Sequence, residues 1–482
     1  MFSASSATVL SSTRTANTRR PRGVARLAAS VVASGLVMAG ALTGAGGAMA
    51  DEAPQHLGGA TATLDGLKTF DTAVLHADGE EQKLPAGLFE MTVDGGGKFK
   101  TYCIDIHNPT QDRAEYLETP WSQTSLGTNK DAGKIRWILE HSYPKIDDLQ
   151  ALAEEAGTGP LSEQTAAAGT QVAIWRYSDD ADVTASDKQA EKLADWLQTS
   201  ATDTAEPKAS LALDPAVVSG RSGERVGPVT VRTNAGQVSV TPPADSASGV
   251  RITDKKGKAV TTAANGSQLY FDIPAGAADG SASLTVQTTT SVPVGRAFAG
   301  ATKSQTQILA GSSDSTVSAS ASATWAGKGA IPAVTAKKNC AKGGVDVTTS
   351  NKGDEAFTYE LAGAEHTVGP GKSETVTVPV AEDQAYDFTV TGPAGFTRTF
   401  KGVLDCLTTT TSNDGLTTQT ADQPTTTTAT AGGSTTGVEG NLAETGSSNA
   451  TPIIAAVAIG LVVIGGGGVF LLRRRKGQPS GE

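Results

Sequence analysis

The 482-residue sequence has few aromatic residues, few cysteines and no excess of basic charge. Aromatic residues make up 5% of the chain while Gly occurs 55 times, so we expect several small β-rich modules rather than one large core. The net charge of −11 argues against binding to nucleic acid or to an anionic membrane, because both require basic surfaces. CxxC, HExxH, Walker and GxSxG motifs are absent, so no metal, nucleotide or serine-hydrolase site is predicted and no cofactor is expected.

The first 50 residues have the pattern of a signal peptide. Arginines without acids are followed by an apolar run over residues 27–45, and Ala48-Met49-Ala50 is a small-x-small cleavage site. We place the mature start at Asp51. General secretion is the favoured route, and the Arg19-Arg20 pair leaves the twin-arginine route open.

The C-terminal end has the pattern of a membrane anchor. Residues 452–472 are apolar or Gly and, at about 1.5 Å per helical residue, would span the roughly 30 Å core of a bilayer. The basic tail, residues 473–482, is predicted to be cytoplasmic. Residues 408–441 are rich in Thr and poor in apolar residues, so they are predicted to form an extended stalk.

A pentapeptide stands between the stalk and the apolar run: Leu442, Ala443, Glu444, Thr445 and Gly446. Together with the apolar run and the basic tail it resembles the LAxTG form of the cell-wall sorting signals of Gram-positive bacteria. The resemblance implies that a sortase cysteine attacks the Thr445 carbonyl, releases Gly446 and transfers the chain to peptidoglycan. Sortase and peptidoglycan are therefore the implied partners, and the implied location is the cell wall.

We expect three folded modules between the signal peptide and the stalk. Residues 51–208 mix strands and helices: hairpin strands are predicted over residues 88–93 and 99–104, and a helix is predicted from a cap at Ser162. Residues 209–328 and 329–407 show alternating apolar residues punctuated by Gly, Pro and Asn, which predicts two all-β, immunoglobulin-like sandwiches. The fold class is thus an α+β head followed by two β-sandwich modules.

Three cysteines in a secreted chain leave at least one without a partner in the chain. Cys340 and Cys406 stand at the first and last strands of the third module, so a disulfide is predicted between them. Cys103 remains. It is either a buried small residue, a thiol for an intermolecular disulfide, or a reactive centre.

The segment Thr170-Gln171-Val172-Ala173-Ile174-Trp175, with the upstream Tyr-Cys-Ile-Asp strand around Cys103, is similar to the thioester domains of Gram-positive surface adhesins. The similarity covers roughly residues 60–200. It implies an internal thioester between Cys103 and Gln171 that an amine, such as a lysine on another surface, can attack. Thr170, Ala173 and Trp175 are expected to position Gln171 and to shield the bond. The protein is then a single-turnover covalent binder rather than an enzyme.

The sequence leaves two alternatives open. In the first, Cys103 is the nucleophile of a cell-surface cysteine enzyme; in the second, it is inert in a purely structural wall protein. His107, four residues after Cys103, is a weak candidate for assisting the chemistry. The sequence does not identify the amine-bearing target.

Overall fold

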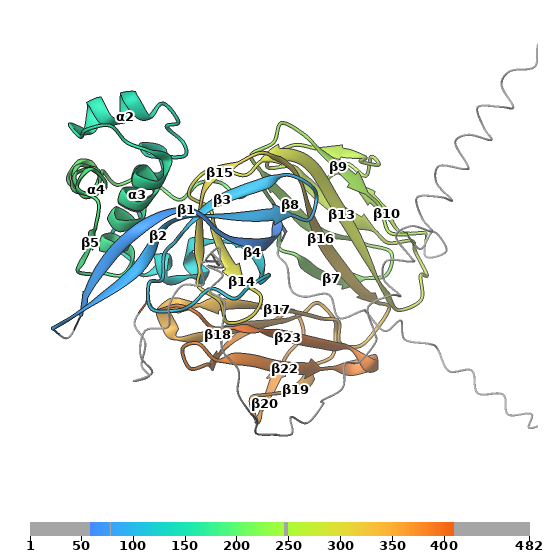
Figure 1. Cartoon of the computed structure of the whole chain (residues 1–482). Helices are drawn as coiled ribbons and strands as arrows, with labels where there is room; N and C mark the ends of the chain where they lie inside the picture. Colours follow the sequence, from blue (N-terminus) through green and yellow to red (C-terminus); the bar gives the residue numbers. More distant parts are fainter. Residues whose placement is uncertain (1–57, 78, 245–248, 409–482) are drawn as a thin grey trace, which may run out of the picture. The chain divides into compact units, whose positions relative to one another are not determined.

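The computed structural model describes residues 58–77, 79–244 and 249–408 (Figure 1). None of the helices in this part of the chain is long and apolar enough to cross a membrane. Several predicted segments lie outside the described residues: the signal peptide, the stalk beyond Thr408, the LAETG motif, the apolar run 452–472 and the basic tail.

The head is built on a seven-stranded sheet with the order β2-β3-β15-β14-β4-β1-β5. Its strands are β1 (Thr61–Ala77), β2 (Glu80–Val93), β3 (Lys98–Cys103), β4 (Glu115–Thr119), β5 (Val183–Ala185), β14 (Ala297–Gly300) and β15 (Gln307–Ser312). Strands β2 and β3 pair antiparallel, with Phe89 opposite Thr101, which confirms the hairpin predicted from the sequence. Cys103 is the last residue of β3.

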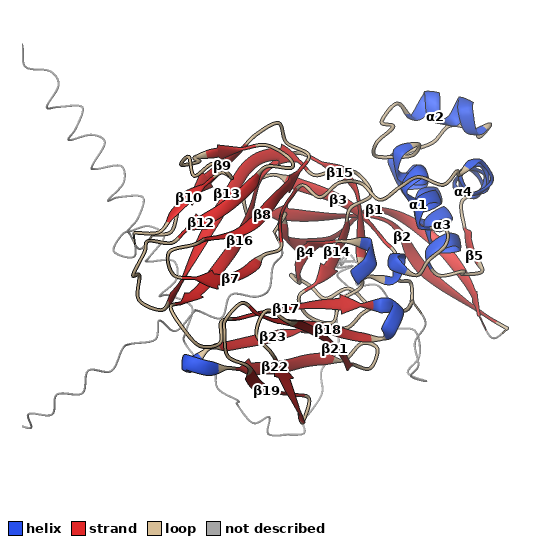
Figure 2. Ribbon diagram, turned by 180° about the vertical axis from the view of Figure 1, so that it is seen from behind, coloured by secondary structure: helices blue, strands red, loops and turns tan. Residues whose placement is uncertain are grey.

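The helices of the head gather at one side of this sheet (Figures 1 and 2). They are α1 (Ala132–Glu140), α2 (Leu149–Ala156), α3 (Glu163–Ser178) and α4 (Lys188–Ser200), with short 3₁₀ turns at Trp121–Gln123 and Ser125–Gly127. Ser162 caps α3 by accepting a hydrogen bond from the Thr165 amide, as predicted. Most of α3 is buried between β1, β2 and α4, so it carries apolar residues on all sides rather than on one stripe.

Gly169 allows α3 to approach α4 closely. A Cβ at this position would lie 2.5 Å from the carbonyl oxygen of Ala190 in α4. A larger residue would push the two helices apart and would displace the adjacent Gln171. The two helices therefore fix where the middle of α3 sits above the sheet.

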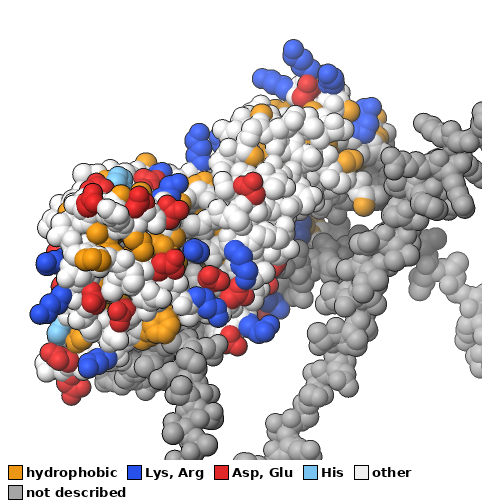
Figure 3. Space-filling view, turned by 45° about the horizontal axis from the view of Figure 1, so that its top comes forward, with side chains coloured by type: hydrophobic (Ala, Val, Ile, Leu, Met, Phe, Trp, Pro, Cys, Tyr) orange, Lys and Arg blue, Asp and Glu red, His pale blue; other side chains and the backbone are white. Residues whose placement is uncertain are grey.

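The second module is a sandwich of two sheets, with the orders β10-β12-β8-β6 and β11-β9-β13-β16-β7. Its strands are β6 (Leu211–Asp214), β7 (Val217–Arg221), β8 (Arg225–Thr233), β9 (Val238–Thr241), β10 (Arg251–Thr253), β11 (Thr262–Ala263), β12 (Gln268–Asp272), β13 (Gly280–Ser291) and β16 (Asp314–Ala326). In the space-filling view of Figure 3, charged side chains crowd the left of the molecule, where Figure 1 places the helices, and smaller charged groups lie elsewhere among largely white surface.

Residues 297–312 fall within the predicted second module, but the structure places them in the sheet of the head. Strands β13 and β16 pair along their whole length, from Gly280 opposite Trp325 to Ser291 opposite Asp314. The chain between them continues into the head, where β14 pairs with β4 and β15 pairs with β3. The β14–β15 hairpin, which leaves the sandwich between β13 and β16, is therefore inserted into the sheet of the head, and head and sandwich share one continuous hydrophobic core.

The third module has its own core and is built from a three-stranded sheet, β17-β18-β21, and two hairpins. Its strands are β17 (Pro332–Asn339), β18 (Gly344–Asn351), β19 (Phe357–Leu361), β20 (Ala364–Val368), β21 (Ser373–Pro379), β22 (Ala385–Thr391) and β23 (Thr397–Val403), and 3₁₀ turns lie at Cys340–Lys342 and Pro393–Gly395. The predicted disulfide is confirmed: Cys340, after β17, is bonded to Cys406, after β23.

A buried ion pair joins the inserted hairpin to the rest of the head. Arg296, immediately before β14, donates from Nε to Glu118 Oε1 at 2.9 Å, and the two side chains are 4% and 1% exposed. The same carboxylate accepts hydrogen bonds from the amides of Ala60, at 3.1 Å, and Ser210, at 2.9 Å. The Glu118 carboxylate thus joins four parts of the chain: β4, the segment before β1, the segment before β6 and the β14–β15 hairpin.

Arg296→Ala should destabilise the head strongly, because it leaves the Glu118 charge buried without its cation. We expect a loss of about 3–5 kcal/mol in the free energy of unfolding, measured by urea denaturation. Arg251→Ala is the matched control: Arg251 is 69% exposed in its pair with Asp272, and its loss should cost about 1 kcal/mol or less. Equal small losses in the two variants would contradict this role of Arg296.

A fragment that ends at residue 208 should not fold, because it lacks β14 and β15 and leaves β3 and β4 with unpaired edges. We expect residues 51–208 to aggregate or to give poorly dispersed amide NMR spectra. Residues 51–328, which contain the hairpin, should melt cooperatively. Cooperative melting of both fragments at the same temperature would show that the hairpin is dispensable.

Candidate functional site

Cys103 and Gln171 lie in direct contact inside the head. The Cys103 amide donates a hydrogen bond to Oε1 of Gln171 at 3.0 Å, and Nε2 of Gln171 donates to the Cys103 carbonyl at 2.8 Å. Both residues have 0% exposure. The end of β3 and the middle of α3 therefore bring together two residues that are 68 positions apart in the sequence.

The Cys103 sulfur faces the loop that follows β3. The thiol donates to the carbonyl oxygen of Asp105 at 3.0 Å, and the Asp105 amide lies 3.2 Å from the sulfur. Burial, followed by the negative charges of Asp179 and Asp105, raises the pKa of the Cys103 thiol well above its usual value. The thiol is therefore neutral at pH 7, in contrast to the low-pKa thiolates of cysteine hydrolases.

The other residues of the TQVAIW segment surround this contact. The Thr170 hydroxyl donates to the Ala166 carbonyl at 2.8 Å, and Ala173 and Trp175 are fully buried. Nε1 of Trp175 has no regular hydrogen-bond partner in the described part of the chain, yet its N–H lies near enough to the sulfur to oppose the rise in the pKa of the Cys103 thiol. A buried donor without a partner is available to stabilise negative charge that develops at the sulfur.

His107 contacts Asp105 through its backbone: the His107 amide donates to Oδ1 of Asp105 at 3.2 Å. The imidazole is partly buried, which lowers its pKa. Among the described residues, no hydrogen bond joins this ring to Cys103. The prediction of a chemical role for His107 therefore rests on the sequence alone.

Three aspartates from different parts of the chain surround the loop after Cys103. Asp105 accepts a hydrogen bond from Nδ2 of Asn108 at 2.7 Å. Asp179, at the C-terminal end of α3, accepts one from the Ile106 amide at 2.9 Å. Asp405, between β23 and Cys406, belongs to the third module. Sequence analysis did not identify Asp179 or Asp405, because only the tertiary structure brings them to this loop.

These carboxyl groups hold protons unusually tightly. Burial raises the pKa of Asp179 to about 7, with a further contribution from the charge of Asp405. Burial likewise raises the pKa of Asp405 to about 6. The pKa of Asp105 lies well above its ordinary value because of burial and of the charges of Asp405 and Asp179. Carboxyl groups in such surroundings do not all ionise together, so the cluster retains a proton near neutral pH.

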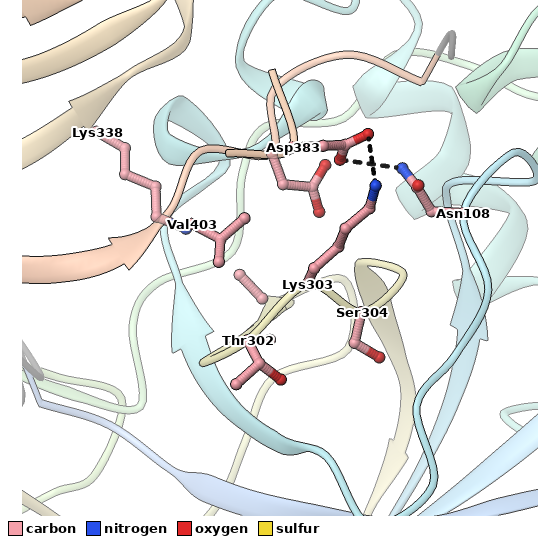
Figure 4. Close-up of a pocket in the computed structure, with 10 residues that line it drawn as sticks. Asn108, Thr302, Lys303, Ser304, Lys338, Asp383 and Val403 are labelled. Carbon is pink, nitrogen blue, oxygen red and sulfur yellow. Dashed lines mark hydrogen bonds and ion pairs between the residues drawn. The ribbon is translucent and has the colours of Figure 1, made fainter. Parts of the chain in front are cut away.

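The third module contacts the same loop. Asp383 accepts a hydrogen bond from Nδ2 of Asn108 at 3.3 Å and pairs with Lys303 at 3.4 Å, and Figure 4 shows these three side chains pointing toward one another. The Thr306 hydroxyl donates to Oδ2 of Asp405 at 2.6 Å. A narrow crevice runs between the two modules here, lined by Asn108, the loop before β15, Lys338, Val403 and Asp405.

Buried amide side chains at β15 support the loop from the other side. Nε2 of Gln305 donates to the carbonyl oxygens of Asp105, at 2.5 Å, and Asn108, at 2.8 Å. Gln307 donates to Oε1 of Gln305 at 3.2 Å and accepts from Thr101 at 3.0 Å. The inserted hairpin therefore fixes both β3 and the loop that contacts the sulfur.

Carboxylate oxygens of Glu382, Asp383 and Asp405 come within 4.8 Å of one another. Lysines balance this charge: Lys303 pairs with Asp383, and Lys338 lowers the pKa of Asp405, against the rise caused by burial. With one oxygen from each side chain, the group also offers fewer ligands than the roughly six to eight oxygens of a calcium site. We assign no metal to this group.

Residues 100–203, which include Cys103 and Gln171, match the family described as Thioester domain, and residues 332–403 match the family described as Bacterial phospholipase C, C-terminal domain. Among solved structures, the chain is similar to the Bacillus anthracis TIE protein (13% identity, 72% of this chain and 81% of that chain, TM-score 0.26). It is also similar to the thioester domain of the Enterococcus faecium TIE86 protein (16% identity, 55% and 96%, TM-score 0.26). No curated protein matches the chain.

The carboxyl cluster predicts that stability falls as pH rises. The pKa of Asp179 is about 7 in the folded chain but about 4 in an unfolded one, so the folded state binds more protons between these values. The contribution is complete below about pH 4 and is lost as pH rises through about 7, at up to about 1.4 kcal/mol per pH unit. Urea denaturation from pH 4.5 to 8 should show this slope.

Asp179→Asn should flatten the slope, because the amide does not titrate. Asp387→Asn, which changes a carboxylate that is 62% exposed on the third module, should leave it intact. A slope that survives in Asp179→Asn would mean that other groups bind these protons.

Proposed function

We propose that this chain is a cell-wall-anchored adhesin whose head forms an internal thioester between Cys103 and Gln171 and uses it to capture an amine on a target surface. The observation that carries the proposal is the two-way hydrogen-bond contact between the Gln171 carboxamide and the Cys103 peptide, in a buried site within the residues that match thioester domains. Without a fold to hold them, a thiol and an amide do not exchange at a useful rate.

The contact suits the chemistry at each atom of the carboxamide. When the Cys103 sulfur attacks the Gln171 carbonyl carbon, negative charge develops on Oε1, which already accepts the Cys103 N–H at 3.0 Å. The departing nitrogen, Nε2, is held by the Cys103 carbonyl at 2.8 Å. A carbon–sulfur bond forms, the carbon–nitrogen bond breaks, and ammonia leaves with the thiol proton.

The product is a stored electrophile in a dry site. Both partners have 0% exposure, so water reaches the bond only when the head opens locally. An amine that enters attacks the same carbonyl carbon, forms an amide with Gln171 and releases the Cys103 thiol. The reaction occurs once per molecule, which is the behaviour of a covalent binder rather than of a turnover enzyme.

Anchoring is the second part of the proposal and rests on the sequence. A signal peptide would export the chain, and a sortase would cleave between Thr445 and Gly446 and join the chain to peptidoglycan. The acidic Thr-rich stalk would then hold the head away from the wall. The target is defined here only by its chemistry, as a protein or surface that presents a primary amine.

The two alternatives fit the geometry less well. A cysteine enzyme would need a base or cation to ionise Cys103, whereas the charged neighbours found around the thiol, Asp105 and Asp179, are acidic and raise its pKa. An inert structural cysteine accounts for the hydrogen bonds to the Cys103 peptide, but not for the Trp175 indole N–H that approaches the sulfur and has no other partner among the described residues.

Intact mass of residues 51–441 tests the proposal. The thioester requires a mass about 17 Da below that of the sequence with its disulfide formed, because ammonia is lost, and a rise of about 31 Da when methylamine adds. Cys103→Ala and Gln171→Ala should each abolish both changes. His107→Ala is the control and should retain both, since no hydrogen bond joins its ring to the thiol in the described part of the chain.

A mass equal to that of the sequence, with no methylamine adduct, would exclude the internal thioester. Alkylation of the native protein then separates the alternatives. A Cys103 thiol that reacts readily would favour an enzyme, and one that resists would favour a structural role.

A further inference from the structure

We propose that the third module takes part in the chemistry of the thioester site. Its residue Asp405 is a positioning residue that acts through Asp179 and Asp105 to keep a proton available beside Cys103. This inference rests on the proposed function and extends the reaction centre beyond the residues that match thioester domains. It also assigns to a predicted spacer module a role in the chemistry of the head.

The loop after Cys103 is held from two sides by Gln305 and Asp383, which we call the clamp. On one side, Gln305 of the inserted hairpin holds the carbonyl oxygens of Asp105 and Asn108. On the other side, Asp383 of the third module accepts from the Asn108 side chain at 3.3 Å. Since the Asp105 peptide touches the sulfur through both its oxygen and its nitrogen, any shift of this loop moves the groups that contact the thiol.

Asp405 is held in place from two directions. The neighbouring residue, Cys406, is tied by its disulfide to Cys340. The Asp405 carboxylate accepts the Thr306 hydroxyl at 2.6 Å, and Thr306 adjoins Gln305 of the clamp. A mere spacer would not need an acidic side chain to meet two other buried acids at this position, because burying like charges together is unfavourable.

Exchange between the Cys103 thiol and the Gln171 amide is helped by a group that can both accept and donate a proton. The Cys103 thiol must lose a proton as the carbon–sulfur bond forms, and the Gln171 nitrogen must gain one as the carbon–nitrogen bond breaks. A carboxyl cluster that holds one proton can give it to the nitrogen and take the thiol proton in return, so that the cluster is unchanged and ammonia carries the proton away. Capture of an amine runs the same transfers in reverse.

The charge of Asp405 sets how tightly the other two carboxyls hold this proton, because it raises the pKa of both Asp179 and Asp105 beyond the rise caused by burial. The titratable and charged groups that face the cluster are Cys103, Tyr116, Asp105, Asp179, Asp405, His107, Lys303, Lys338, Glu382 and Asp383. Replacing Asp405 by Asn removes the negative charge with little change in size.

The test compares Asp405→Asn with the wild type, both as residues 51–441, by the rate of methylamine addition between pH 5 and 9, measured by intact mass. The free-amine concentration is the same for both at each pH, so it cancels in the ratio of rates. We expect a ratio near one at pH 5, where the cluster is protonated in both. The ratio should fall towards about one-tenth above neutral pH if the pKa of the cluster drops by one unit.

Asp387→Asn, on the exposed face of the same module, is the matched control and should follow the wild type at every pH. Asp405→Glu should restore the rate in part. The effect of Asp405→Asn should be smaller in the Asp179→Asn background than in the wild type, because Asp405 then acts through Asp105 alone. A structural defect would instead lower the rate by the same factor at all pH values and would add to the effect of Asp179→Asn.

If Asp405→Asn does not fold, Thr306→Val provides the same test. It removes the 2.6 Å hydrogen bond that favours the charged form of Asp405, so the ratio should fall in the same direction by a smaller factor. A pH-independent ratio of one in the folded variant overturns the inference. A wild type without the deficit of about 17 Da would contradict the proposed function itself. If the wild type reacts with methylamine and the variant has the same pH profile, only the role of Asp405 is contradicted.

Discussion

The structure depends on one contact, between the carboxamide of Gln171 and the peptide of Cys103. It joins the middle of a buried helix to the end of a sheet strand, and neither Cys103 nor Gln171 has solvent-exposed surface. A buried amide without partners is costly, so this pairing fixes how far along its axis and at what rotation α3 lies on the sheet. Gly169, which lets α4 approach α3, and the capping box at Ser162 serve the same placement.

The position of β3 is equally constrained, and here the connectivity of the chain matters. Strand β3 lies between β2 and β15, and β15 follows the sandwich strands β6 to β13 in the chain, with β16 still to come. The hydrogen bonds of Gln305 and Gln307 then reach across to the loop and to Thr101. The contact between Cys103 and Gln171 consequently depends on residues that follow most of the sandwich in the sequence, far outside the segment that carries these two side chains.

Local sequence patterns predicted the elements but not their long-range pairing. The 88–104 hairpin, the helix that begins after Ser162 and the Cys340–Cys406 disulfide each leave a signal within a short window or in the cysteine arithmetic, and the structure contains them. Strands β14 and β15 are only four and six residues long, and nothing in their composition says that they pair with β4 and β3 rather than within the sandwich. The same holds for Asp179 and Asp405, which are ordinary acidic residues until the fold buries them together.

Burial of Cys103 and Gln171 has two opposing effects on the proposed chemistry. Burial would protect the proposed thioester from water, but the same burial makes the Cys103 thiol hard to ionise and would leave the departing nitrogen without a solvent proton. A cluster of acids whose pKa values are raised by burial and mutual repulsion answers both needs, since it can accept one proton and supply another without bulk water. Asp383 of the third module accepts a hydrogen bond from Asn108 of the loop at 3.3 Å, whereas Gln305 of the inserted hairpin donates to the loop at 2.5 and 2.8 Å and the neighbouring Thr306 donates to Asp405 at 2.6 Å. The inserted hairpin is therefore the main link between the third module and the groups that contact the sulfur.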